Sequence, residues 1–201
     1  MKSFQKYISV LFLTMFLAIP TFAGDLEDIT SVMKEKVNAI ITTLKDPTML
    51  KCEKNVKISQ ISEGIFDYSL MSKLSIGKQN WGKFSAVQKK EFVTLFTLRM
   101  KQSYIEKAHL LSDEQVTVHD AQQVKPTRIQ LSLVIHGKDK DVDMKYKYYK
   151  AKNGKWLIYD VEIANISILQ TYRAQFADKL KNASVEELLE QLRSTKSEKS
   201  S

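Results

Sequence analysis

Residues 142–148 constrain the fold more than any other stretch, because apolar and charged side chains alternate there without a break. The alternation separates two sets, Val142, Met144, Tyr146 and Tyr148 against Asp143, Lys145 and Lys147. Successive side chains of a β-strand point to opposite faces of the sheet, so a period of two predicts a strand. The strand should have one buried face and one solvated face.

Three neighbouring runs show the same period and extend the prediction to a sheet between about 112 and 163. They place apolar residues on one face at Val116 and Val118, at Ile129, Leu131, Leu133 and Ile135, and at Leu157, Tyr159, Val161 and Ile163. Asn153-Gly154 separates two of these runs and predicts a hairpin turn, because both residue types tolerate positive φ. Consecutive strands joined by short turns predict a four-stranded antiparallel meander with one apolar face.

The rest of the chain predicts helices, which would cover the apolar face of the sheet. Ser85, Ser167 and Ser184 are each followed three residues later by Gln or Glu, the pattern of a helix-initiating capping box. Apolar residues recur every three or four positions in about six segments, expected at 25–45, 49–62, 66–77, 85–109, from 167 and from 184. The fold class predicted is α+β, with helices from both ends of the chain around the sheet.

The first 23 residues have the pattern of a cleaved signal peptide. Lys2 and Lys6 precede a twelve-residue apolar run at 8–19, and Ala23 supplies a small residue at the expected cleavage site. The apolar run is shorter than the roughly 20 residues that span a bilayer. We therefore expect an exported protein with one α+β domain at 24–193 and a disordered tail at 194–201.

Charge and cysteine content narrow the functional classes. Removing residues 1–23 takes away two lysines and no acidic residue, which lowers the net charge from +8 to +6. Lysines spread along the chain are typical of a solvated surface, with attraction to anionic lipid as the other interpretation. The single Cys52 excludes an internal disulfide, and an exported protein without a basic cluster is not expected to bind nucleic acid.

The sequence offers no convincing catalytic or metal site. It contains no dinucleotide or phosphate-loop glycine motif and no G-x-S-x-G elbow. The three histidines lack partners at metal-ligand spacing, and nothing identifies a base for Cys52. Asp160 and Glu162 are two residues apart, which suits a solvated strand face better than a catalytic pair. We expect no enzyme, metal or cofactor; the alternative is a hydrolase or isomerase in a cone-shaped α+β fold.

The apolar residues that remain are candidates for either core or ligand contacts. Periodicity alone does not decide between them, because an apolar face packs against another face or surrounds a cavity in the same pattern. A solid core would favour a non-catalytic adaptor protein. The set that would line a cavity is Phe92, Phe96, Met100, Tyr104, Leu133, Val142, Met144, Tyr146, Tyr148, Leu157, Tyr159, Val161, Tyr172 and Phe176.

Two strings of residues resemble a known family. The first string is Phe66-Asp67-Tyr68, Met71, Leu74, Gly77, Trp81, Ser85, Gln88, Glu91-Phe92, Phe96 and Tyr104. The second is Gly154-Lys155-Trp156, Tyr159-Asp160-Val161, Ile166-Ser167, Tyr172-Arg173, Gln175 and Phe176. Together they are similar to the periplasmic MlaC-like family, also called toluene-tolerance or ABC-transporter auxiliary proteins. The similarity is collinear from Leu26 to Leu192 and departs from the family at 182–184, where glycines are common.

The resemblance implies a soluble, monomeric periplasmic carrier that encloses a phospholipid between the sheet and the helices. Such a carrier would exchange lipid with an outer-membrane lipoprotein complex and with an inner-membrane ABC transporter that has a ring-forming lipid-binding subunit. Its role would be to maintain outer-membrane lipid asymmetry. Arg173 would contact the lipid head group, or else pair structurally with Asp67 or Asp160.

Overall fold

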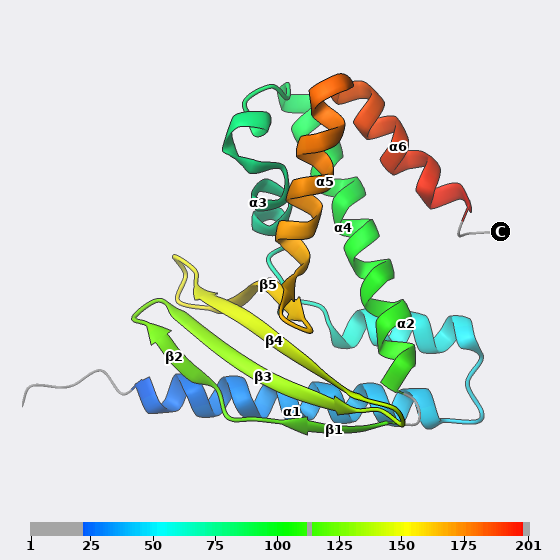
Figure 1. The fold of residues 1–201 in the computed structure, drawn as a ribbon. Helices are drawn as coiled ribbons and strands as arrows, with labels where there is room; N and C mark the ends of the chain where they lie inside the picture. Colours follow the sequence, from blue (N-terminus) through cyan, green and yellow to red (C-terminus); the bar gives the residue numbers. More distant parts are fainter. Residues whose placement is uncertain (1–21, 112–113, 199–201) are drawn as a thin grey trace, which may run out of the picture.

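The computed structural model describes residues 22–111 and 114–198, which form two regions joined by one long helix. Figure 1 shows a base, made of the β-sheet with helices α1 and α2, and a bundle of helices α3, α5 and α6 standing on it. Helix α4 belongs to both, because its first half packs in the bundle and its second half reaches down to the base (Figure 1). We use the names base and bundle in this sense below.

All six predicted helices are present. Their bounds are α1 Phe22–Lys45, α2 Lys51–Ile61, α3 Tyr68–Trp81, α4 Ala86–Ala108, α5 Ile168–Asn182 and α6 Val185–Glu198, with a 3₁₀ turn η1 at His109–Leu111. The Ser85 and Ser184 capping boxes form with both reciprocal hydrogen bonds. Helix α6 continues to Glu198, past the boundary at residue 194 where a disordered tail was expected. The proposed signal peptide lies almost entirely outside the described residues.

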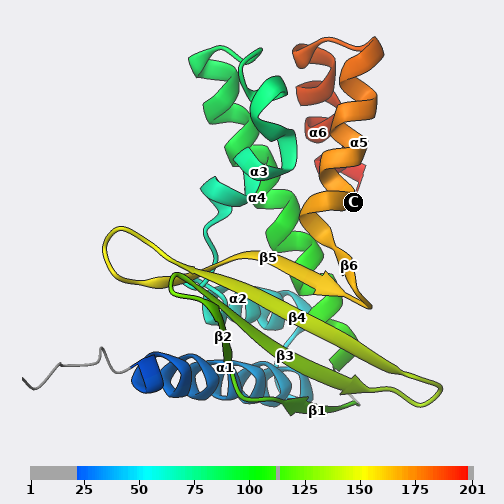
Figure 2. The ribbon, with the colours of Figure 1, turned by 60° about the vertical axis from the view of Figure 1, so that its left-hand side comes forward.

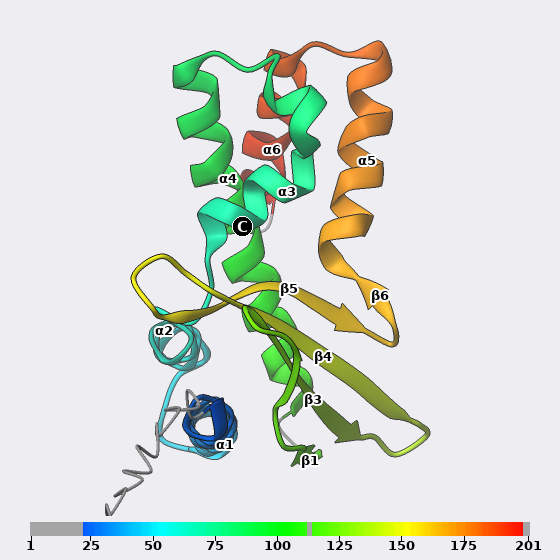
Figure 3. The same cartoon turned by 90° about the vertical axis from the view of Figure 1, so that its left-hand side faces the viewer.

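The sheet is antiparallel, as predicted, but it has six strands and not four. The strands are β1 Gln115–Val118, β2 Gln122–Lys125, β3 Arg128–His136, β4 Asp141–Lys150, β5 Trp156–Ile163 and β6 Ile166–Ser167. Their order is β1-β3-β4-β5-β6. The short β2 pairs with the first residues of β3, whereas β1 pairs with its last residues. Figures 2 and 3 show β5 and β6 nearest the bundle and β1 farthest from it. The two additional strands are short and lack an alternating pattern, which explains why the sequence did not predict them.

A β-bulge corrects the predicted face of β5. Lys147 on β4 pairs with Asp160, but the next residue, Tyr148, pairs with Ile158, so Tyr159 is left without a partner. One extra residue on a strand reverses which side the following side chains face. Ile158 is therefore fully buried on the apolar side, where Leu157 and Tyr159 were expected.

The Asn-Gly hairpin forms, but through a different turn from the expected one. Gly154 has φ +83°, whereas Asn153 is not among the residues with positive φ. The Gly154 N–H donates to the Ala151 carbonyl, and the Ala151 N–H donates to the Lys155 carbonyl. These bonds enclose a three-residue loop in which only the glycine takes the left-handed conformation, a common hairpin alternative to the two-residue turn.

Two connections hold the bundle on the base. The segment before α3 pairs with β5: the Ile158 N–H donates to Ile65 and the Asp67 N–H donates to Ile158. Asp67 then caps α3 by accepting from the Leu70 N–H, and it also accepts from the Tyr149 hydroxyl on β4. The second connection is β6, which pairs with β5 and leads directly into α5.

Candidate functional site

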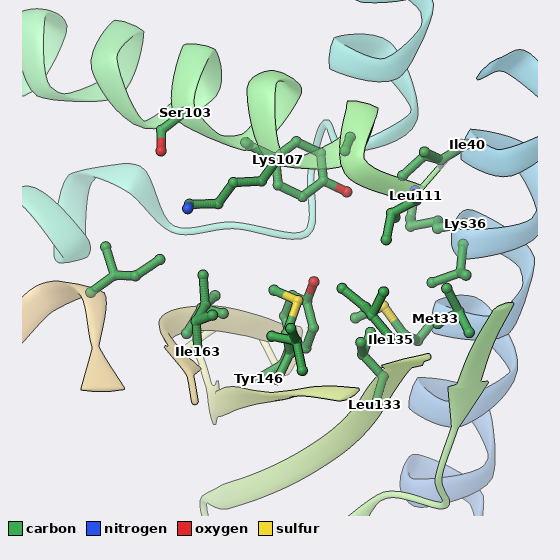
Figure 4. A pocket seen from close by; sticks show the side chains of 18 of the residues that line it. Met33, Lys36, Ile40, Ser103, Lys107, Leu111, Leu133, Ile135, Tyr146 and Ile163 are labelled. Carbon is green, nitrogen blue, oxygen red and sulfur yellow. The ribbon is translucent and has the colours of Figure 1, made fainter. Parts of the chain in front are cut away.

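The base contains an apolar cavity between the apolar face of the sheet, helix α1 and the second half of α4 (Figure 4). Its volume is about 230 Å³. A single water molecule needs about 10–15 Å³ by the same measure, so the space exceeds a packing defect many times over. The cavity is open to solvent, because the exposed Lys107 is part of its wall.

The walls are apolar because three regular elements point one face each into the same space. Helix α1 contributes Met33, Val37 and Ile40 from the stripe that the sequence predicted. Strands β3 and β4 contribute their apolar faces. Helix α4 has two parts: its first half presents Phe92 and Phe96 to the bundle, whereas its second half contributes Met100, Ser103, Tyr104, Lys107 and Ala108 to the cavity wall.

Polar groups in the cavity are few and sit at separate places. Ser103 and Lys107 lie one turn apart on α4, and both side chains point to the same end of the cavity, above Ile163 (Figure 4). Lys36 lies near the other end, where its ammonium donates to the Ile61 carbonyl at 2.5 Å and ties α1 to the end of α2. At the end of the cavity where Ser103 lies, the wall therefore carries an exposed positive charge, that of Lys107.

Three tyrosines add hydroxyl groups to this wall: Tyr68, Tyr104 and Tyr146. Burial raises the pKa of each above its ordinary value, to about 12 for Tyr68, and the nearby Tyr146 contributes to the rise at Tyr104. All three phenols are therefore neutral hydrogen-bond donors at any physiological pH. Tyr146 points from the sheet towards α4 (Figure 4).

Seven of the fourteen residues predicted to contact ligand line the cavity. They are Met100 and Tyr104 on α4, Leu133 on β3, Val142, Met144 and Tyr146 on β4, and Val161 on β5. Val142, Met144 and Tyr146 are three of the four residues that alternation placed on the apolar face of β4; the fourth, Tyr148, is not on the wall. The role of these side chains in ligand binding is taken up below as a proposal.

Four others, Phe92, Phe96, Tyr172 and Phe176, belong to the bundle and not to the cavity. Their rings pack on one another, with centroid separations of 5.3–6.3 Å. Phe92 and Phe96 are fully buried there together with Met71 and Leu189. The prediction placed these rings opposite the sheet because helical periodicity does not show where along α4 the sheet ends.

The last three predicted residues lie elsewhere in the base. Tyr148 is buried in the packed part of the sheet core beside Ile129 and Ile158. Tyr159 contacts the Tyr149 ring at 6.1 Å and the Arg128 guanidinium at 5.5 Å. It reaches that position through the bulge, which also displaces Leu157 from the cavity wall.

Arg173 is not part of the cavity either. It is exposed on α5, and its guanidinium covers Gly77, where its Nε would lie 3.2 Å from an added Cβ. Gly77 interrupts α3 with φ +73° and ψ 154°, a conformation restricted to glycine. Neither expected ion pair, with Asp67 or with Asp160, occurs among the described residues; Arg173 packs over the kink of α3.

Several cavity residues were not predicted as site residues, although the sequence placed some of them on apolar faces. Met33, Val37 and Ile40 were recognised as the apolar stripe of α1 but were not assigned to the site. Ile135 and Ile163 continue the apolar faces of their strands. Phe66 lies in the segment between α2 and α3, and Ile168 is the first residue of α5; only the tertiary structure brings them to the wall.

The residues considered for catalysis have structural partners. Asp160 is 95% buried and accepts from the Ser167 hydroxyl at 2.8 Å, the Leu169 N–H at 3.3 Å and the Lys147 ammonium at 3.2 Å. Glu162 pairs with Lys145 at 3.4 Å and also with Lys147. Cys52 is exposed, and the described residues contain no cluster of three or more metal-ligating side chains. Asp160 therefore anchors the start of α5.

Comparisons with known proteins agree with this architecture. The structure of a phospholipid-binding protein from Ralstonia solanacearum, solved in complex with a phospholipid, superposes with a TM-score of 0.70. The two chains share 20% sequence identity, and the match covers 86% of this chain and 98% of the other. A search of curated proteins finds no significant match. The model of the MlaC protein family matches residues 34–194, which is most of the chain, and therefore the chain belongs to the MlaC family.

Proposed function

We propose that this protein is a periplasmic phospholipid carrier and that the cavity of the base holds the acyl chains. The observation that carries the proposal is a solvent-open, apolar cavity of about 230 Å³ on a fold shared with a phospholipid-binding protein. Each methylene exposed to water costs about 0.8 kcal/mol, so a lipid with two long chains does not cross an aqueous space unaided. A carrier removes that cost by enclosing the chains.

The charged head group would remain at the end of the cavity marked by Ser103 and Lys107. An ammonium and a hydroxyl one helical turn apart suit a phosphate, which accepts hydrogen bonds and carries negative charge. Arg173 lies outside the cavity wall, so this proposal replaces it as the head-group contact.

The cellular setting of the proposal follows from the export signal and the family. After cleavage near Ala23, the chain would act as a monomer between an outer-membrane lipoprotein complex and an inner-membrane ABC transporter. Among the described residues, no helix has the length and hydropathy needed to cross a bilayer. The adaptor alternative required a solid base, and the cavity argues against it. The buried, fully bonded Asp160 argues against the enzyme alternative.

Native mass spectrometry of purified residues 24–201 tests the proposal directly. We expect adducts of phospholipid mass that disappear after delipidation and return on incubation with phospholipid vesicles. Met144→Trp places a larger side chain in the cavity wall and should reduce loading severalfold, since it occupies space that the chains need.

Leu157→Trp is the matched control, because Leu157 lies on the neighbouring strand but not on the wall. It should load normally. A wild-type chain that takes up no phospholipid from vesicles contradicts the proposal, and a folded Met144→Trp variant that loads fully contradicts the assignment of the site.

A further inference from the structure

The proposed acyl-chain site leaves the tyrosine hydroxyls of the cavity wall unexplained: that of Tyr68 is buried without a partner among the described residues, and those of Tyr104 and Tyr146 lie on two different elements. Tyr104 lines the cavity from α4 and Tyr146 from β4, on the opposite wall. Tyr146 is 93% buried, and its side chain extends into the space between the sheet and α4 (Figure 4). Neither of these two hydroxyls hydrogen-bonds to another described residue, and neither oxygen is fully enclosed by protein atoms, so both reach the cavity space.

Unpartnered donors in such a position restrict what the cavity accepts. Buried polar groups in proteins are almost always hydrogen-bonded, and leaving one unsatisfied is unfavourable. If hydrocarbon alone filled the space around Tyr104 and Tyr146, both donors would lose contact with water and gain nothing in return. A ligand that binds well must therefore bring acceptor atoms to the depth of these two hydroxyls.

We propose that Tyr104 and Tyr146 donate hydrogen bonds to the acyl carbonyl oxygens of the bound lipid, so that the cavity selects acyl lipids over ether lipids. This inference rests on the proposed function and adds a chemical requirement to it. The order of groups along the cavity matches the order within a phospholipid: Ser103 and Lys107 lie at one end, Tyr146 lies in the middle, and Met33 and Ile135 lie at the other end (Figure 4).

The chemistry of the two side chains suits this task. Both are phenols whose pKa is raised by burial, so they remain protonated and are available to donate. The carbonyl oxygen of an ester lipid is a good hydrogen-bond acceptor. An ether lipid has no such carbonyl, and the hydrocarbon tail of either lipid has no acceptor. No bond of the lipid is made or broken, and the tyrosines act only in recognition. A neutral hydrogen bond corresponds to roughly a 2- to 12-fold difference in an equilibrium constant.

A competition experiment with two synthetic lipids tests the inference. Delipidated protein is incubated with vesicles that contain equal amounts of a diester and a diether phosphatidylcholine of the same chain length, and loading is read by native mass spectrometry. The two lipids differ in mass, so one spectrum reports both. We expect the wild-type protein to prefer the diester lipid by about 5-fold. The Tyr104→Phe/Tyr146→Phe double variant should load both lipids about equally.

Tyr159→Phe is the matched control, because it removes a tyrosine hydroxyl from the sheet outside the cavity wall and should keep the full preference. Equal loading of the two lipids by the wild-type protein overturns the inference and leaves the carrier function intact. A diester preference that persists in the double variant also overturns it. Failure of the wild-type protein to load either lipid overturns the proposed function itself, and the inference with it.

Discussion

The bundle and the base use the same helix and the same kinds of side chain, yet one interior is filled and the other is hollow. In the bundle, Phe92 and Phe96 of α4 meet Phe176 of α5, and the rings close the space completely. Two to three turns further along the helix, Ser103, Tyr104 and Lys107 lie on the wall of a cavity. An amphipathic pattern thus shows which side chains face inward but not whether the interior is full.

The difference has a geometrical cause. In the bundle, α4 is surrounded closely by α3, α5 and α6, so ring edges and faces interlock at centroid distances near 5.5 Å. In the base, α4, α1 and the apolar face of the sheet surround a common space, and their side chains leave a cavity of about 230 Å³ (Figure 4). We therefore expect stability to depend mainly on the bundle and on the packed part of the sheet core.

The largest expected effect is the difference in the free energy of unfolding that is lost when one side chain is shortened in each interior. Phe96→Ala removes a fully buried ring and should lower the free energy of unfolding by about 3–5 kcal/mol, because it creates a cavity in a packed core. Ile135→Ala removes a side chain that already borders open space and should cost only about 1 kcal/mol. Urea unfolding of both variants measures the difference. Equal losses would contradict the division into a filled and a hollow region.

The next effect concerns the contact that joins the two regions. Asp160→Ala should cost about 3 kcal/mol, since it removes a buried carboxylate and leaves the Ser167 hydroxyl and the Leu169 N–H without their acceptor. Glu162→Ala, two residues away, is the control and should cost about 1 kcal/mol, because its ion pairs are more exposed. Thermal unfolding followed by circular dichroism compares them. A smaller loss at Asp160 than at Glu162 would refute its anchoring role.

The smallest effect compares a bonded tyrosine hydroxyl with an unbonded one. Tyr149→Phe removes the hydrogen bond to Asp67 and should cost about 1 kcal/mol, whereas Tyr146→Phe should change the stability of lipid-free protein by less than about 0.5 kcal/mol. Denaturant titration of the two delipidated variants measures both values. A large loss for Tyr146→Phe would mean that its hydroxyl already has a structural partner.

The same bond gives a pH signature. The hydrogen bond to Asp67 raises the pKa of Tyr149 from 10 to about 12. Its contribution to stability is therefore fully present below pH 10 and is lost as the pH rises from 10 towards 12. The Tyr149→Phe variant should lack this component when unfolding is measured between pH 9 and pH 12. An unchanged pH dependence would show that the bond does not form in solution.

The sequence by itself determined the class of fold and most of its elements. Alternation in 142–148 predicted β4 and its cavity-facing side, and the serines at 85, 167 and 184 predicted where three helices begin. These predictions succeeded because strand alternation and helix capping depend on residues within a few positions of one another. The resemblance of the two residue strings to the MlaC family is likewise confirmed by the family match.

The tertiary structure alone decided which apolar residues surround a cavity. The bulge at Tyr159 depends on pairing with β4, so the alternation within β5 does not reveal it and assigned Leu157 and Tyr159 to the wrong face. The position where α4 leaves the bundle decided that Phe96 packs in a core while Tyr104 lines a cavity. Both outcomes depend on contacts between segments distant in sequence, and a local pattern carries no information about the volume that such segments enclose.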